Sequence, residues 1–265
     1  MQSEHKEALI RVEDLHMNFN PGTVNEIAVF NGFDFSAEPG EFVSVVGSNG
    51  SGKTTLLNVI CGSLSADRGR IFLKGKDITG MPEHQRAASI GRVFQNPAAG
   101  TCPNLTILEN LSLADNKGSS FGLRKGVNKK RSDEYRSRLR LLQLGLEDKL
   151  DILVGALSGG QRQALALLIA TMTPIDLLIL DEHTAALDPR SSETVMELTL
   201  RVIEEKQLTA LMVTHNLRFA VEYGNRLVMM HEGRSVIDTK ETGKSACTID
   251  SLLKTFNEIS VECGN

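Results

Sequence analysis

Residues 47 to 55 carry side chains and a spacing that suit phosphate binding. They read Gly-Ser-Asn-Gly-Ser-Gly-Lys-Thr-Thr, which contains the pattern Gly-x-x-x-x-Gly-Lys-Thr from Gly47 to Thr54. Glycines let backbone N–H groups converge on phosphate oxygens, and a following helix directs its positive end at the same anion. We expect Lys53 to reach the β- and γ-phosphates of a nucleotide, Thr54 to bind Mg²⁺ and Thr55 to contact the α-phosphate. Taken alone, the pattern could also be an accidental Gly-rich turn. The expected cradle consists of Gly47, Ser48, Asn49, Gly50, Ser51, Gly52, Lys53, Thr54 and Thr55.

A pair of carboxylates follows a second apolar segment. The run Leu177 to Leu180 ends directly in Asp181 and Glu182. Because the carboxyl ends of parallel strands open into the ligand crevice of an α/β sheet, both side chains are expected beside the cradle. Asp181 is predicted to hold Mg²⁺ through its water shell, and Glu182 to orient and deprotonate an attacking water. An ordinary acidic pair at a helix start is the alternative.

A third motif, Leu-Ser-Gly-Gly-Gln, occupies residues 157–161. We expect a helix to begin near Arg162, directly after it. Ser158 and the backbone amides of Gly159 and Gly160 would then form a second anion site at a helix N-terminus.

The elements that must position these motifs alternate between strands and helices. A strand at 41–46 and a helix at 53–61, closed by Gly62, surround the cradle. The segment 81–157 contains Pro82, Pro97 and Pro103, and it predicts helices from Thr106 and from Asp133, the second ending at Gly145. Further predicted elements are strands at 8–12 and 27–35 joined by a Pro21-Gly22 turn, strands at 177–180 and 209–214, a hairpin at Glu232-Gly233 and a helix at 249–259.

The cradle and the Leu-Ser-Gly-Gly-Gln motif, in this order in one chain, resemble the ATP-binding subunit of an ABC transporter. The resemblance covers roughly residues 8 to 240. It implies an α/β fold: a P-loop NTPase core with a parallel-rich central sheet, an N-terminal antiparallel β-subdomain and an inserted α-helical subdomain. The implied single domain spans 1–265, with core and β-subdomain at about 1–93 and 159–242, the helical subdomain at about 94–158 and a tail at 243–265.

The resemblance also assigns roles to further residues. Gln95 falls in the family's Q-loop, where it would touch Mg²⁺ and the water, and His215 matches the switch histidine that contacts the γ-phosphate. Phe19 takes the position of the ring that stacks on adenine, and Asp188 that of the D-loop. His183 departs from the proline of many relatives, and a solvent-facing or packing role is favoured for it. The implied catalytic residues are Glu182, His215, Gln95 and Lys53, the metal-binding residues Thr54, Gln95 and Asp181.

In the family, the signature residues Ser158, Gly159, Gly160 and Gln161 close on the ATP of the opposite subunit. The resemblance therefore implies a head-to-tail homodimer that holds two ATP molecules with Mg²⁺. A separate integral-membrane permease and an extracytoplasmic solute-binding protein are the other implied partners, and the cytoplasmic face of the cell membrane is the implied location.

Composition narrows the function classes. The chain has 265 residues, 41% of them hydrophobic, and a net charge of −4, which gives no global basic field for nucleic acid. The N-terminus lacks the apolar run of a signal peptide, and the most apolar stretch, Ala164 to Met172, is too short to span a bilayer. The four cysteines are Cys61, Cys102, Cys247 and Cys263. They form no CxxC pair and no spacing typical of metal ligands, which favours a chain whose thiols are reduced.

Three functions remain open at this level. The favoured one is an importer ATPase that powers transport of a small organic solute. The segment Asn18 to Ile27 resembles ATPases paired with permeases of the branched-chain amino-acid type, which suggests an amino acid. An efflux or lipoprotein-extracting complex is the alternative, and a soluble ATPase of DNA repair or translation is the third. The segment 117–131 holds six basic residues and no acidic one: Lys117, Arg124, Lys125, Lys129, Lys130 and Arg131. It is expected to be either a solvated loop or a contact with anionic lipid or with a partner.

Overall fold

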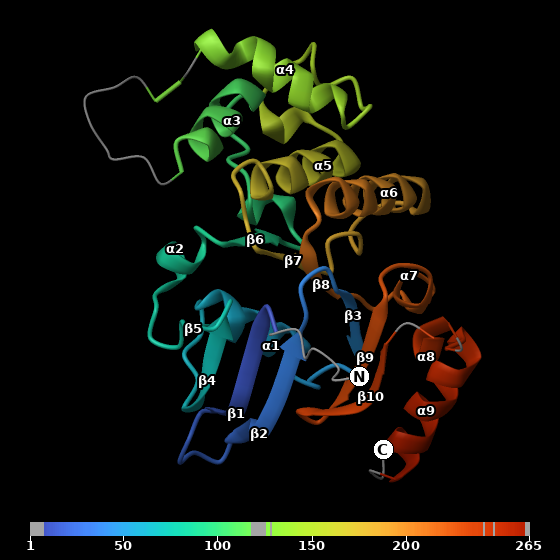
Figure 1. Ribbon diagram of the computed structural model, residues 1–265. Coiled ribbons are helices and arrows are strands. Elements are labelled where there is room, and N and C mark those ends of the chain that lie inside the picture. Colours follow the sequence, from blue (N-terminus) through green and yellow to red (C-terminus); the bar gives the residue numbers. More distant parts are fainter. Residues whose placement is uncertain (1–7, 118–125, 128, 241, 246, 263–265) are drawn as a thin grey trace, which may run out of the picture. The chain divides into compact units, whose positions relative to one another are not determined.

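The computed structural model describes residues 8–117, 126–127, 129–240, 242–245 and 247–262 of the chain. They form two compact units, which are drawn in Figure 1. The first unit combines the described parts of 1–87 and 207–265, and the second is built from 88–206. The expected division into core, β-subdomain, helical insert and tail remains a prediction.

An antiparallel sheet lies in the first unit. Its described strands follow the order β2-β1-β4-β5, with β1 (Ile10–Phe19), β2 (Ile27–Ala37), β4 (Arg68–Leu73) and β5 (Lys76–Asp77). β1 buries alternate apolar side chains up to Val12 and again from Leu15. The register shifts between these two residues, where Asp14 takes a φ of 47°. Leu15 stands three residues after Val12, an odd number that would put it on the opposite face of a regular strand. The bulge returns it to the core face, so the strand runs to Phe19 instead of ending at Val12.

A second group of strands in the same unit contains the strand that leads into the cradle. It has the order β10-β9-β3-β8, with β3 (Phe42–Gly47), β8 (Thr209–Val213), β9 (Arg226–His231) and β10 (Arg234–Lys240). β3 lies between β8 and β9, runs parallel to both and is buried along its whole length. This burial explains its continuous apolar sequence. The predicted hairpin is confirmed, with Glu232 and Gly233 at positive φ between β9 and β10.

Helix α1 (Lys53–Cys61) matches its predicted bounds, because Gly62 ends it in a left-handed conformation. The N–H of Gly62 donates to the Asn58 carbonyl at 2.9 Å. Helix α9 (Ile249–Glu262) buries Leu252 against a cluster that contains Val46 of β3. The remaining described helices of this unit are α2 (Glu83–Arg86), α7 (Leu217–Glu222) and α8 (Thr242–Ser245).

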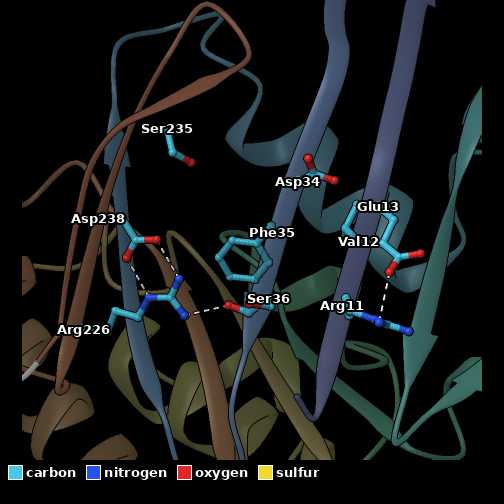
Figure 2. A pocket seen from close by; sticks show the side chains of 9 residues that line it. All are labelled: Arg11, Val12, Glu13, Asp34, Phe35, Ser36, Arg226, Ser235 and Asp238. Atoms are coloured by element: carbon cyan, nitrogen blue, oxygen red, sulfur yellow. Dashed lines mark hydrogen bonds and ion pairs between the residues drawn. The ribbon is translucent and has the colours of Figure 1, made fainter. Parts of the chain in front are cut away.

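Arg226 joins the two groups of strands in this unit, as Figure 2 shows. Its side chain is 6% exposed. Its Nε and Nη2 donate to the two carboxylate oxygens of Asp238, each at 2.7 Å, and its Nη1 donates to the Ser36 carbonyl at 2.6 Å and to Glu41 at 2.8 Å. Because a buried charge must be paired and hydrogen-bonded, this fully engaged guanidinium is a fixed part of the core.

In the second unit, strands β6 (Ile90–Val93) and β7 (Leu177–Asp181) pair in parallel. The helices predicted after Thr106 and around the third motif are present. The described helices are α3 (Ile107–Asp115), α4 (Ser132–Arg140), α5 (Gly159–Ala170) and α6 (Pro189–Lys206), with short 3-10 turns η1 (Pro97–Ala99), η2 (Lys129–Arg131) and η3 (Val154–Ala156). Parallel strands, a separate antiparallel sheet and helices confirm the expected α/β class.

One predicted helix end is wrong. The helix expected from Asp133 to Gly145 ends at Arg140. Beyond it, the N–H of Leu142 and the N–H of Gln143 bond to carbonyls three residues back, and Gln143 takes a φ of 55°. These tight turns stop the helix before the glycine that marked its end in the sequence. Among the described residues, no helix has the length and apolar character needed to cross a membrane.

Candidate nucleotide site

The predicted cradle is the loop between β3 and α1. Its glycines are required by close approach as well as by their backbone angles. Gly47 has a φ of 154°, and a Cβ there would lie 2.2 Å from the Met230 carbonyl oxygen. Gly52 has a φ of 99°, and its Cβ would lie 2.8 Å from the ring of Phe30. A side chain at either position would push the loop away from the sheet, so the backbone can line a small anion only if both stay glycine.

Lys53 is held over this loop by the loop itself. Its ammonium donates to the carbonyls of Gly47 and Ser48 at 2.9 and 2.8 Å and lies 3.4 Å from the Ser51 hydroxyl. The residue is 5% exposed. These contacts place a positive charge at the N-terminus of helix α1, where the N–H groups of the first turn also favour an anion.

Thr54 and Thr55 start the same helix. Thr54 is exposed and Thr55 is half-buried, while neighbouring Ser51 is buried. A hydroxyl oxygen is a hard ligand of the kind that Mg²⁺ takes together with phosphate oxygens and waters. The loop therefore offers the donors that a magnesium-bound triphosphate needs.

The structure brings His215 to the same edge of the sheet as the cradle. β3 and β8 are in register at Val45 and Val213, and the N–H of Thr214 donates to the Val45 carbonyl at 3.2 Å. His215 follows in an exposed turn. Asn216 fixes that turn, because its side chain accepts from the N–H of Phe219 and caps α7. The histidine is thus presented by a capped turn, two residues beyond the strand.

Two further ring-bearing residues, Phe19 and His231, stand at strand ends in the same unit. Phe19 lies half-buried at the last position of β1, opposite Ile27, and stacking on adenine remains a prediction. His231, which sequence reasoning missed, ends β9 with its Nδ1 3.3 Å from the Ser48 hydroxyl. Its only sequence signal was its place before the Glu232-Gly233 turn.

In the second unit, Gln95 and the two carboxylates share one strand edge. Val93 and Leu180 are in register, so the chain leaves β6 and β7 at the same end. Gln95 is exposed, and Asp181 and Glu182 are partly buried. Glu182 has a φ of 46°, a left-handed conformation that is costly for a residue with a side chain. The turn places Glu182 outside the ladder directly after the strand, which suits a general base.

Asp181 has a partner that sequence reasoning missed. Its Oδ2 accepts a hydrogen bond from Arg92 Nη2 at 2.6 Å, and the two side chains are 11% (Arg92) and 13% (Asp181) exposed. The only hint in the sequence was an arginine within the short apolar strand 90–93. This pair adds a positive charge next to the carboxylate expected to hold the metal.

His183 packs in the interior and is not solvent-facing. It is 2% exposed, and its Nε2 lies 3.1 Å from the Thr199 hydroxyl. That hydroxyl donates its proton to the Val195 carbonyl at 2.8 Å, so it accepts from His183, which carries its proton on Nε2. Burial lowers the pKa of His183 to about 4. His183 is therefore a neutral, structural residue that ties the turn after Glu182 to Thr199 of α6.

The signature motif forms the start of α5. The helix begins at Gly159, three residues before the predicted start near Arg162. Ser158 is its N-cap: the hydroxyl accepts from the N–H of Gln161 and the Gln161 side chain accepts from the N–H of Ser158, both at 3.2 Å. Gln161 also donates to the Leu144 carbonyl at 3.2 Å. The cap occupies one amide and leaves those of Gly159 and Gly160 without intrahelical acceptors, as an anion site requires.

The signature helix lies against the start of α6. A Cβ on Gly159 would be 3.1 Å from Leu187, and one on Gly160 would be 3.1 Å from Ser191. Asp188 caps α6 by accepting from the N–H of Ser191 at 3.1 Å, and hydrogen bonds from Ser191 hold its pKa below the usual value. The second unit therefore brings the signature and Asp188 together, and Asp188 has a local role as a cap.

The basic segment 117–131 is described in part, since residues 118–125 and 128 lie outside the described residues. Arg131 forms ion pairs with Asp115 of α3 and, at 2.6 Å, with Glu134 of α4. This cation therefore links two helices. A contact of the segment with lipid or a partner stays a prediction.

Comparison with known proteins decides the family. The family model described as ABC transporter matches residues 30–185. This chain belongs to that family. A relative from Clostridioides difficile (strain R20291), named tyrosine transport ATP-binding protein, is 45% identical over 250 residues, covering 94% of this chain and 98% of the relative. The chain is the ATP-binding subunit of an ABC transporter, and its reaction is ATP hydrolysis.

Solved structures of other ABC cassettes have the same fold. The ADP conformation of MJ1267, an ATP-binding cassette of an ABC transporter, matches with a TM-score of 0.78 and 26% identity, over 98% of this chain and 100% of that one. The dimeric post-hydrolysis state of the cassette MJ0796, bound to ADP and Pi, matches with a TM-score of 0.74 and 26% identity, over 87% and 98%. These cassettes bind nucleotide, and the second does so as a dimer.

Proposed function

We propose that two copies of this chain enclose two ATP molecules head to tail. Each ATP would lie between the cradle of one copy and the capped signature helix of the other. The observation that carries this proposal is the N-terminus of α5. Its exposed cap residue Ser158 and the amides of Gly159 and Gly160 form an anion site separate from the cradle. The dimeric cassette bound to ADP and Pi supports the same arrangement.

Within that site, the side chains divide the chemistry. Lys53 and the first-turn amides of α1 bind the β- and γ-phosphates, and His215 contacts the γ-phosphate. Glu182 orients and deprotonates the water, while Gln95 contacts both the water and the metal. Phosphoryl transfer relies on positioning and charge stabilisation, which is what this set of donors supplies. Phe19 stacks on the adenine.

The oxygen donors that would hold Mg²⁺ are the Thr54 hydroxyl, the Asp181 carboxylate and the Gln95 amide oxygen, which are of the hard kind that this ion takes. When bound, it neutralises charge that develops on the phosphates during transfer. The protein's own part is to present the carboxylate at the strand edge, where β7 ends.

The test of the composite site uses Ser158→Arg. We expect the variant to bind ATP as the natural chain does and to lose hydrolysis, because the larger cation blocks the partner's site but not the cradle. Ser158→Thr is the control, since threonine can also cap a helix and should keep activity. Full hydrolysis by Ser158→Arg, or hydrolysis by natural chain that does not depend on protein concentration, would contradict the proposal.

For the transported molecule, we propose import of an amino acid or similar small organic solute through a separate integral-membrane permease. The named relative, a tyrosine transport ATP-binding protein, supports this choice. The chain would lie at the cytoplasmic face of the membrane, against the permease. A solute-binding protein outside the membrane remains a prediction.

Uptake measurements test the solute. A strain that lacks this chain should lose uptake of labelled tyrosine or another amino acid, and a plasmid copy should restore it. A Lys53→Ala copy should not restore uptake. Unchanged uptake of every amino acid tested, together with slower export of a labelled compound, would reverse the direction of transport.

A further inference from the structure

The ion pair between Arg92 and Asp181 differs from the ion pair between Arg226 and Asp238. Arg226 uses two nitrogens on two oxygens of Asp238 and also donates to the Ser36 carbonyl (Figure 2). It has a further acceptor in Glu41. Arg92 donates to Asp181 through Nη2, and its buried Nε has no hydrogen-bond partner within the described residues. A single contact is weaker and less directional than a fork of two, so this pair is easier to exchange.

The sheet nevertheless holds the guanidinium in place. Arg92 is in register with Ile179, two residues before Asp181, so both side chains of the pair lie on the same face of the two strands. The guanidinium carbon lies 4.6 Å from the centroid of the Phe94 ring. The Phe94 carbonyl in turn accepts from Gln163 of α5 at 2.9 Å. The ring contact therefore adds a second attraction, besides the hydrogen bond, that holds the cation next to Asp181.

We propose that Arg92 is an exchangeable counter-ion of Asp181, which neutralises this carboxylate until a divalent cation takes it over. The inference rests on the proposed role of Asp181 in holding Mg²⁺. A carboxylate with 13% of its side chain exposed benefits from a positive partner in each state, because an unpaired charge shielded from water is unfavourable. Arg92 meets that need without the metal. It also repels the metal and shares the carboxylate's charge, so it lowers the gain in nucleotide affinity that Mg²⁺ brings.

Nucleotide binding with and without metal tests this role. The quantity is the ratio of two dissociation constants for a fluorescent, non-hydrolysable ATP analogue, one in EDTA and one in Mg²⁺. In Arg92→Met, Asp181 loses this counter-ion, so Mg²⁺ gains more by binding the carboxylate. We expect the ratio to rise by about tenfold, which is ~1.4 kcal/mol. Arg92→Lys keeps the positive charge but loses the planar guanidinium over the Phe94 ring, so it should raise the ratio less than Arg92→Met does.

Two results for Arg92→Met would overturn the counter-ion role. A ratio in Arg92→Met that equals that of the natural chain would make Arg92 a structural residue only. A lower ratio would make it a residue that orients Asp181 for the metal, and either result overturns the counter-ion role. Arg92→Gln, which can still donate to Asp181 without a charge, serves if Arg92→Met does not fold. Arg138→Met is the matched control, since Arg138 pairs with the Glu134 carboxylate at 2.9 Å.

Asp181→Asn separates this inference from the proposed function. If Asp181 binds the metal, this variant lowers the ratio toward one, whatever Arg92 does. If its ratio equals that of the natural chain, the metal role of Asp181 fails and the counter-ion inference fails with it. If Asp181→Asn lowers the ratio and Arg92→Met does not raise it, only the counter-ion inference fails.

Discussion

Acidification should destabilise this protein through the buried His183. Burial lowers the pKa of His183 from its ordinary 6.5 to about 4. Above the ordinary pKa the imidazole is neutral in both the folded and the unfolded chain, and it makes no difference to stability. As the pH falls from 6.5 toward 4, the unfolded chain binds a proton that the folded chain does not. The free energy of unfolding therefore decreases over this window.

The size of the effect follows from the shift in pKa. One pKa unit corresponds to ~1.36 kcal/mol, so the whole window removes roughly 3 kcal/mol. Between about pH 7 and about pH 5, the loss through this one histidine is ~2 kcal/mol. Nε2 already donates to Thr199, so the added proton sits on Nδ1 inside the core.

Denaturant unfolding of the natural chain and of His183→Gln at both pH values checks this prediction. Glutamine can still donate to Thr199 but does not titrate, so the variant should lose ~2 kcal/mol less on acidification. His84→Gln, at an exposed position of α2, is the control and should behave as the natural chain does. If His183→Gln and the natural chain lose the same free energy between the two pH values, the buried neutral histidine is refuted.

Three further predictions concern the nucleotide site. Gly47→Ala should weaken ATP binding by at least tenfold and lower the melting temperature, because a Cβ would lie 2.2 Å from the Met230 carbonyl; equal affinity in a binding titration would show that the loop can move. Glu182→Gln should bind ATP, slow hydrolysis by about 10²–10⁴ and accumulate the dimer on size-exclusion chromatography with ATP; near-normal turnover would remove Glu182 from the role of base. Ser158→Ala should lose the cap over the Gln161 N–H and ~1 kcal/mol of unfolding free energy, measured by denaturant titration; unchanged stability would mean that water replaces the cap.

Much of the site could be predicted from the chain because its chemistry depends on local sequence. The Gly-rich loop, the acidic pair and Leu-Ser-Gly-Gly-Gln each combine a turn with a strand end or a helix start. The backbone preferences of glycine and of helix-capping residues then put these motifs at the strand ends and helix starts. Helix α1 has its predicted bounds because Gly62 can adopt the φ of 84° that ends it.

The misses share a different origin. α4 ends before Gly145, because consecutive tight turns replace the last helical residues. β1 continues past Val12, because a bulge restores its burial pattern. α5 begins earlier than predicted, because Ser158 and Gln161 satisfy each other's backbone N–H. For the two helices, hydrogen bonds between particular groups outweigh the average preference of the residues, and for β1 the pairing with its neighbours does so.

The sequence by itself determined which family the chain resembles and where α1 and the hairpin at Glu232-Gly233 lie, since these depend on residues close together in the chain. Only the tertiary structure decided that Arg92 pairs with Asp181, 89 residues away, and that His183 is buried and neutral. Strand register and burial set the partners and the solvation of a side chain. Both arise when distant segments pack together, and no local pattern records them.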